Sequence, residues 1–170
     1  MRNPFISIAN KKSKSRFYLK TYDTAVDVLS AVALCNGLSR AILDLATVAM
    51  NVKNECEVDL QELDKALGIK SAVTRTKALN ILRLMNLIET TTGNRSGVTK
   101  FRINFRAFTT DVESEAAKGK GFNEPLNFDA LDENGFIKEK SIKNYKARKT
   151  AKVDIFDDIE DYAIDASKYL

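Results

Sequence analysis

The stretch Asp59-Leu-Gln-Glu-Leu-Asp-Lys-Ala-Leu-Gly-Ile-Lys-Ser71-Ala-Val-Thr-Arg-Thr-Lys-Ala-Leu-Asn-Ile-Leu82 decides the fold of this chain. It predicts two short helices, because the side chains of Asp59 and Ser71 can accept hydrogen bonds from the free N–H groups at a helix start. Gly68 lies between them and permits the left-handed backbone that ends a helix. Apolar residues recur at helical spacing, so each helix is expected to bury one face, formed by Leu60, Leu63, Leu67, Ala78, Leu79, Leu82 and Met85.

The flanking sequence predicts the rest of a small α+β domain. Upstream, Ser39 is expected to cap a further helix, and Val58 to lie in a short extended segment. Downstream, the β-branched residues of Leu87–Thr91 and Val98–Ile103 predict two strands joined by the glycine-rich tip Gly93–Gly97. The predicted order is therefore helix, strand, helix, turn, helix and hairpin.

The N-terminal part is predicted to be a basic extension of this domain. Phe5–Ala9 and Arg16–Tyr22 are β-prone runs and are expected to form a hairpin. A helix should follow, capped by Asp23 or Thr24 and ended by Asn36-Gly37. The chain is thus divided into three predicted parts: residues 1–37, residues 38–108 and residues 109–170.

The C-terminal part is predicted to be a partly disordered tail. Thr109–Asn127 is polar and interpreted as a linker, and Ser141–Lys152 as a basic segment of indefinite structure. Asp154–Leu170 carries apolar residues at helical spacing among acids, which predicts an acidic amphipathic helix. Such a helix could dock on a protein partner, cover the protein's own basic face, or pack on the domain.

The composition argues against an enzyme. The chain has no histidine, so the usual catalytic triads and common zinc sites lack a base or a ligand. No phosphate-binding glycine motif occurs, and Asp132-Glu-Asn-Gly135 has Ala130 and Ser141 where a calcium loop needs carboxylates. It is interpreted as a turn. We therefore expect no catalytic residue, no metal and no cofactor.

The two cysteines and the hydropathy pattern indicate the compartment. Cys35 and Cys56 are too few for a disulfide framework and are expected to be buried thiols in a reducing cytosol. The longest apolar stretch, around Ala41–Met50, is interrupted by Asp44 and is far too short to span a membrane. A cytoplasmic protein without a membrane partner is predicted.

The distribution of charge favours a polyanionic partner. The net charge is only +4, but Met1–Lys20 has six basic residues and no acid, and Lys70–Arg106 has eight basic residues against Glu89. Lys138–Lys152 has seven more against one acid. Three clusters of cations, one of them overlapping the predicted helix pair, favour nucleic acid over an ordinary solvated surface.

Four stretches resemble winged helix-turn-helix regulators: Leu38–Ala46, Asp59–Ile69, Ser71–Ile88 and Gly97–Asn104. They are most similar to the RepL-type replication proteins of small plasmids and, more generally, to MarR-like regulators. Those families share a Leu-Ala-x-x-Leu-Gly-Ile helix followed by a Ser-x-x-Thr-Val-Ser-Arg-Ala-Leu-x-x-Leu recognition helix. The exit Phe101-Arg-Ile-Asn-Phe105 resembles the Tyr-Arg-Ile-Asn-Pro of the plasmid family.

The resemblance covers about 70 of the 170 residues and has three departures. Arg75 stands where a buried valine is usual, Asn86 where glycine is usual, and Ile42 where glutamate is frequent. Asn86 is a plausible substitute because asparagine tolerates positive φ better than most residues. The resemblance implies an α+β winged helix that binds double-stranded DNA, usually as a homodimer.

The geometry of such a domain selects the candidate DNA-binding residues. A major groove admits one helix, whose first residues face the base edges. The hairpin tip would enter the minor groove or contact the backbone, and the basic N-terminus would contact phosphates. The candidates are Ser71, Val73, Thr74, Arg75, Thr76 and Lys77 on the helix, Asn94, Arg95 and Lys100 on the hairpin, and Lys11, Lys12 and Lys14 in the N-terminus.

Three functions remain compatible with the sequence. The first is a sequence-specific transcriptional regulator of plasmid or phage type. The second is a replication initiator that binds origin repeats, suggested by the Phe-Arg-Ile-Asn exit. The third is a winged-helix module that binds protein. Several apolar residues exceed what one buried stripe needs: Val26, Val28, Leu34, Ile81 and Leu84. They indicate either packing of the first helix against the third or a dimer interface, and the resemblance favours a homodimer.

The basic N-terminus generates a first prediction. Replacing Lys11, Lys12 and Lys14 with alanine should weaken binding to all duplexes about equally, because phosphate contacts do not depend on sequence. Each lost contact should remove roughly 0.9 from the slope of log K against log salt. Fluorescence anisotropy at several salt concentrations measures this slope. An unchanged slope would show that the three lysines do not contact the duplex.

Overall fold

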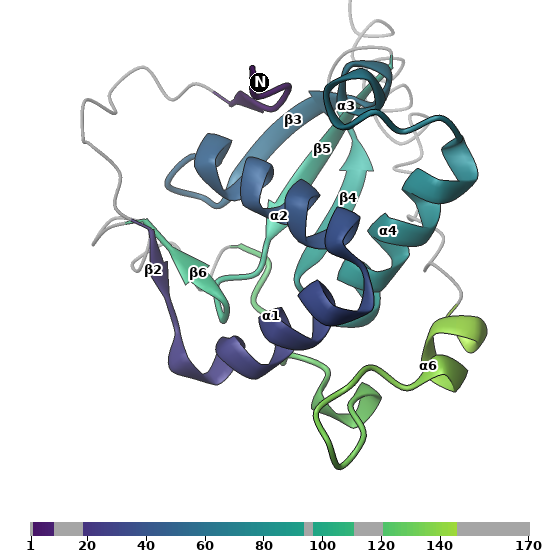
Figure 1. Ribbon diagram of the computed structural model, residues 1–170. Coiled ribbons are helices and arrows are strands. Elements are labelled where there is room, and N and C mark those ends of the chain that lie inside the picture. Colours follow the sequence, from purple (N-terminus) through teal and green to yellow (C-terminus); the bar gives the residue numbers. More distant parts are fainter. Residues whose placement is uncertain (1, 9–18, 94–96, 111–120, 146–170) are drawn as a thin grey trace, which may run out of the picture.

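A computed structural model describes residues 2–8, 19–93, 97–110 and 121–145 of the chain (Figure 1). The described part is α+β and follows the predicted order of helix, strand, helix, turn, helix and hairpin. Its elements are β1 (Ile6–Ser7), β2 (Lys20–Thr21), α1 (Asp23–Cys35), α2 (Gly37–Ala49), β3 (Glu55–Asp59), α3 (Leu60–Leu67), α4 (Ala72–Leu84), β4 (Ile88–Thr92), β5 (Val98–Ile103), β6 (Phe108–Thr109), the 3-10 turn η2 (Phe128–Ala130) and α6 (Glu139–Asn144).

An antiparallel sheet with the strand order β1-β3-β5-β4 forms one layer of the domain. Cys56 lies opposite Phe101, and Ile88 lies opposite Ile103, so these four side chains point to the same face. All four are buried. Because side chains alternate along a strand, the neighbouring charged residues of β3, β4 and β5 occupy the other face.

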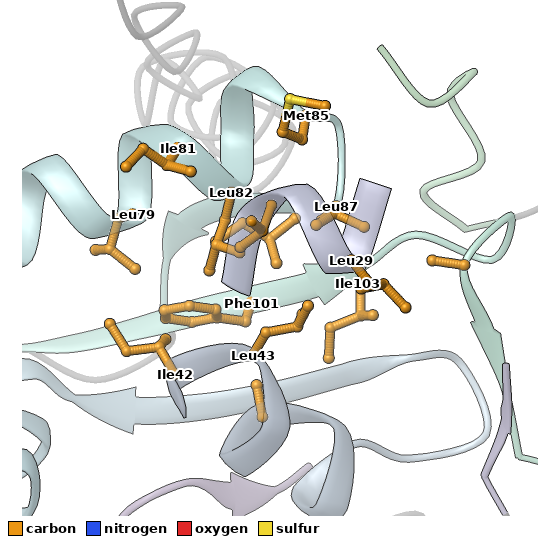
Figure 2. Packing of buried hydrophobic residues seen from close by; sticks show 14 of the residues in the cluster. Leu29, Ile42, Leu43, Leu79, Ile81, Leu82, Met85, Leu87, Phe101 and Ile103 are labelled. Atoms are coloured by element: carbon orange, nitrogen blue, oxygen red, sulfur yellow. The ribbon is translucent and has the colours of Figure 1, made fainter. Parts of the chain in front are cut away.

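Helices α1, α2 and α4 cover the apolar face of the sheet (Figures 1 and 2). Figure 2 shows Ile42 and Leu43 of α2 and Leu82 of α4 converging around Phe101. The ring of Phe5 packs edge-on against Phe101 with centroids 5.0 Å apart, which brings the N-terminal segment into the same core. One continuous core therefore joins the sheet, the helices and the segment before β1.

The predicted caps of the helix pair are confirmed. The Asp59 carboxylate accepts hydrogen bonds from the N–H groups of Gln61 and Glu62 at 2.7 and 3.4 Å. The Ser71 hydroxyl accepts one from Val73 at 3.1 Å, and Gly68 ends α3 with φ 64°. Asn86 likewise has φ 56°, so it occupies the left-handed position predicted for it.

The two upstream helices begin differently from the prediction. Tyr22, and not Asp23 or Thr24, precedes α1, and it makes no side-chain cap. Asn36 ends α1 in an extended conformation and caps α2, since its side chain accepts from the Ser39 N–H at 3.0 Å. Ser39 is therefore not the cap but is buried within α2.

The predicted N-terminal hairpin is wrong. Ile6–Ser7 pairs with Cys56 and Glu57 of β3, whereas Lys20–Thr21 pairs with Phe108 and Thr109 of β6. Each short run thus adds to a strand that is distant in sequence, and the two runs belong to different sheets. β-Propensity identified extended segments here but could not identify their partners, because pairing depends on non-local packing.

The prediction of a linker over Thr109–Asn127 is wrong for residues 121–127, which pack on the domain. Leu126, Ala130 and Ile137 are all buried in the core. Residues 128–145 continue with η2, the predicted turn at Asp132–Gly135 and helix α6, which packs beside α4. The prediction of indefinite structure for Ser141–Lys152 is wrong for residues 141–144, which belong to α6. The predicted acidic helix at Asp154–Leu170 lies outside the described residues.

Three asparagine side chains attach this C-terminal segment to the domain. Asn86 Nδ2 donates to Pro125 O at 2.7 Å, and Asn127 Nδ2 donates to Leu84 O at 2.8 Å. Asn104 is fully buried; its Nδ2 donates to Asn86 O at 2.6 Å and to Glu124 O at 2.7 Å. The end of α4, the end of β5 and residues 124–127 are therefore joined through one polar cluster.

This cluster generates a second prediction. Replacing Asn104 with alanine should lower the free energy of unfolding by roughly 1–3 kcal/mol, because its carbonyl partners would lose their donor inside the protein. Urea denaturation monitored by circular dichroism measures the change. The exposed turn residue Asn134, replaced with alanine, serves as the control and should change stability far less. Equal stability of the two variants would contradict the role assigned to Asn104.

Candidate nucleic-acid interface

The first two turns of α4 form the main exposed surface of the predicted helix pair. Ala72, Val73, Thr74, Thr76 and Lys77 are all exposed, whereas Ala78 and Leu79 behind them are buried. Val73 retains 78% of its accessible surface, although it is apolar. The helix therefore has a buried C-terminal half and an N-terminal half in which small, apolar and cationic side chains face solvent. We call the exposed residues the α4 face.

Polar contacts hold α4 against its neighbours on two sides. The Ser39 hydroxyl donates to Ala78 O at 3.0 Å, which links α2 to the middle of α4 inside the core. Near the other end, Arg83 donates to the Thr90 hydroxyl of β4 and, at 2.8 Å, to Asn80 Oδ1. Burial lowers the pKa of the Arg83 guanidinium, so this arginine is a structural residue and no part of the exposed face.

Arg75 is the one candidate on the helix whose charge is already paired. Its guanidinium bonds the Asp64 carboxylate of α3, and the two side chains are only 16% and 22% exposed. The pair spans the turn between the two helices. Arg75, expected to stand where a buried valine is usual, is thus accommodated by directing its charge toward Asp64 of α3.

Lys77 lies close enough to the end of α1 to act on Cys35. Burial raises the pKa of the Cys35 thiol, and the positive charge of Lys77 partly offsets this rise. Cys35 is exposed, so its expected burial is wrong, whereas Cys56 is buried as predicted and its pKa is strongly raised. The charge of Lys77 on the α4 face is thus felt at the C-terminal end of α1.

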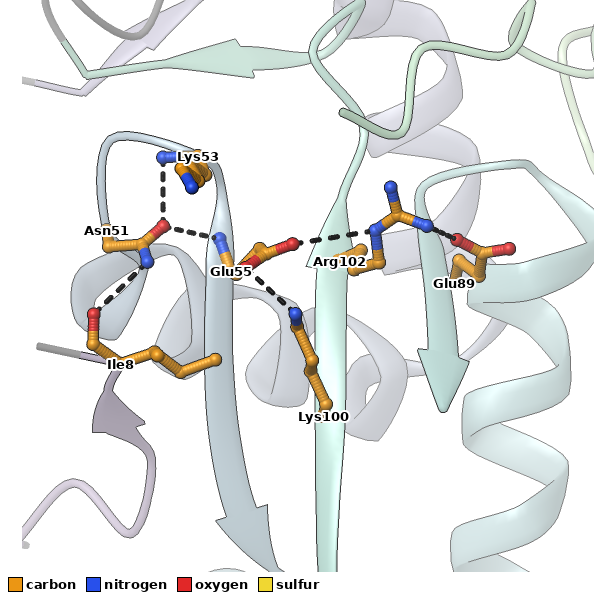
Figure 3. A network of polar contacts seen from close by, with 7 residues as sticks. All are labelled: Ile8, Asn51, Lys53, Glu55, Glu89, Lys100 and Arg102. Atoms are coloured by element: carbon orange, nitrogen blue, oxygen red, sulfur yellow. Dashed lines mark hydrogen bonds and ion pairs between the residues drawn. The ribbon is translucent and has the colours of Figure 1, made fainter. Parts of the chain in front are cut away.

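The outer face of the sheet carries a ladder of ion pairs (Figure 3). Lys100 Nζ lies 2.9 Å from a Glu55 carboxylate oxygen, and Arg102 lies between Glu55 at 3.7 Å and Glu89 at 2.7 Å. The Asn51 side chain fixes the start of β3 by accepting from the Glu55 N–H at 3.0 Å. Lys100, a predicted DNA contact, is therefore paired with β3 and is not grouped with the α4 face.

The remaining predicted contacts lie outside the described residues: Asn94 and Arg95 at the hairpin tip, and Lys11, Lys12 and Lys14 in the N-terminus. The hairpin that carries the tip is present as β4 and β5. The structure thus brings together Ser71, Val73, Thr74, Thr76 and Lys77, and it separates Lys100 from them.

A basic site beside α3 was not predicted as a unit. Arg2, Asn3 and Ile6 lie against Glu62 and Lys65, around a cavity of about 390 Å³. The sequence indicates Arg2 only as one of the basic residues of Met1–Lys20. Its position beside α3 follows from the pairing of β1 with β3, which no local pattern in the sequence indicates.

The apolar residues that suggested a dimer divide into two groups. Val28, Ile81 and Leu84 are buried within the chain, so they give no support to a dimer interface. Val26 and Leu34 of α1 are exposed. Val28 is buried on α1, and α1 packs against α2.

Comparison with family models, with curated proteins and with solved structures finds no match to this chain. Among the described residues, no cluster of three metal-ligating side chains is present. Within the same residues, no helix is both long and apolar enough to cross a membrane.

The Asp64–Arg75 pair generates a third prediction. A double-mutant cycle with Asp64→Ala and Arg75→Ala should give a coupling energy of roughly 1 kcal/mol, because the pair is mostly buried and spans two helices. Chemical denaturation of the four proteins measures it. Arg40 and Asp44, a more exposed pair within α2 at 2.8 Å, provide the control cycle and should couple more weakly. Additive effects at Asp64 and Arg75 would contradict the bridge.

Proposed function

We propose that this protein is a sequence-specific regulator that binds double-stranded DNA through a winged helix-turn-helix, with α4 as the recognition helix. The observation that carries the proposal is the α4 face. An exposed helix start without acidic residues, held on a packed core, is the surface that a major groove can accept. The order of α2, β3, α3, α4 and the β4–β5 hairpin supports the same assignment.

Each exposed residue of the α4 face has a chemistry suited to DNA. Thr76 and Val73 can contact a thymine methyl group, and Lys77 can donate to a guanine edge or to a phosphate. Thr74 and Ser71 can donate to phosphate oxygens, as can N–H groups of the first turn that remain free. An apolar side chain as exposed as Val73 costs free energy in water, and a thymine methyl would cover it.

The ion pairs change the expected roles of two cations. Arg75 bonds Asp64, and Lys100 bonds Glu55, so each would have to leave a carboxylate before it contacted DNA. We therefore assign Arg75 to orienting α3 against α4, and Lys100 to stabilising the sheet. We assign phosphate contacts flanking the groove to Arg2 and to Lys65 of α3, which line one cavity.

The alternative function, a replication initiator, was suggested by one stretch of sequence that has a structural role in the fold. It depended on Phe101-Arg-Ile-Asn-Phe105, but Phe101, Ile103 and Phe105 are buried and Asn104 holds the C-terminal segment. These residues have structural roles in the domain, and the replication role stays a prediction. A footprint on the protein's own upstream region would support regulation, whereas one on repeats at an origin would support initiation.

A fourth prediction tests the α4 face. Thr76→Ala together with Lys77→Ala should weaken specific binding, since each lost base contact costs roughly 1–3 kcal/mol. The duplex is first selected from random sequences with the wild-type protein, and affinity is then measured by anisotropy. Thr21→Ala with Lys53→Ala is the matched control, because both residues are exposed and lie in β2 and in the loop before β3, outside the α4 face.

The outcome separates the proposals. A folded Thr76/Lys77 variant with unchanged affinity would contradict the groove assignment. Failure of the wild-type protein to select any duplex would instead favour the interpretation of the fold as a protein-binding module.

A further inference from the structure

A cavity of about 510 Å³ opens on the side of the domain formed by the start of α1 and the C-terminal segment. Its walls are mostly apolar and come from three separate parts of the chain: Tyr22, Phe105, Pro125, Leu126 and Phe128. This volume lies in the range of pockets that hold small molecules. Leu126 and Phe105 are buried, whereas Phe128 leaves 47% of its surface exposed at the rim.

Among the described residues that line the cavity, Arg106 supplies the only charged side chain. Its Nε donates to Asn123 O at 3.1 Å, which fixes the guanidinium at the cavity wall. No carboxylate lies among the lining residues, and Arg106 forms no ion pair with any other described residue. A guanidinium held in this way presents its terminal N–H groups to an anion, and a carboxylate matches their fork-like geometry.

From this arrangement we infer that the cavity is a binding site for a small apolar molecule that carries one carboxylate. Aromatic and aliphatic walls would cover the apolar body of the ligand, and Arg106 would bind its charged end. The same walls exclude a strongly polar ligand, because burying its polar groups would leave them without partners.

The back wall of the cavity is part of the structure that ends α4. Pro125 O accepts a hydrogen bond from Asn86 Nδ2 at 2.7 Å. Two residues later, the Asn127 side chain donates a hydrogen bond to Leu84 O. The Asn127 N–H also lies 3.4 Å from Met85 O. A ligand that fixes residues 123–128 would therefore also stabilise the C-terminal end of α4. Control of DNA binding by this ligand, unlike the site itself, rests on the function proposed above.

The test of the site needs no DNA. Isothermal titration calorimetry with the full chain would use 2-naphthoate and decanoate as probes, and their neutral amides as matched ligands. The wild-type protein should bind at least one acid more tightly than its amide. Arg106→Gln should weaken binding of that acid about tenfold or more and leave binding of the amide within twofold. Arg40→Gln, a partly exposed arginine on α2, should change neither.

Two further measurements complete the test. Hydrogen exchange at the amides of Leu87 and Asn127 should slow when the acid is present, as expected if the wall and the end of α4 are stabilised together. A Leu126→Ala variant should lose affinity for the acid and the amide alike. The inference is overturned if neither acid binds at millimolar concentration, or if binding does not depend on Arg106. Duplex affinity, measured separately with and without the acid, then shows whether the site controls DNA binding.

Discussion

The arrangement of the domain depends on the packing of helix α4. One side of the helix is buried in the core, while its first two turns are exposed to solvent. Its buried residues belong to the same hydrophobic core as α2 and the sheet: Ala78, Leu79, Ile81, Leu82 and Leu84. Burying a large apolar side chain contributes about 1.5–3 kcal/mol, so this contact outweighs any single ion pair nearby. The hydrophobic contact therefore sets the position of the helix, while Ser39 and Arg75 adjust its direction through directed polar bonds.

Asparagine side-chain amides join the end of α4, the end of β5 and the C-terminal segment, in addition to the hydrophobic contacts between them. Asn86, Asn104 and Asn127 bind backbone carbonyls across the end of α4, the end of β5 and residues 124–127. An amide can serve several backbone groups at once, which makes it suited to a junction of irregular segments. The same junction forms the back of the cavity at Arg106, so the candidate DNA face and the candidate ligand site lie at opposite ends of one connected structure.

Local chemistry was enough to predict the central elements. Asp59, Gly68, Ser71 and Asn86 act through their nearest neighbours in the chain, and each occupies the predicted position. The alternation of β4 and β5 was equally clear, because a two-residue period directly assigns the faces of a strand. The α4 face follows from the same local pattern, since a helix with one apolar stripe exposes its remaining residues.

The sequence by itself determined the helix pair, the hairpin and the exposed start of α4, because caps, turns and periodicity are short-range properties. Only the tertiary structure decided the partners of Ile6–Ser7 and Lys20–Thr21, and the packing of residues 121–145 on the core. It alone paired Arg75 with Asp64 and Lys100 with Glu55, two cations that the sequence predicts as DNA contacts. These outcomes depend on which distant groups meet in space, and charge or β-propensity at one position does not specify its partner.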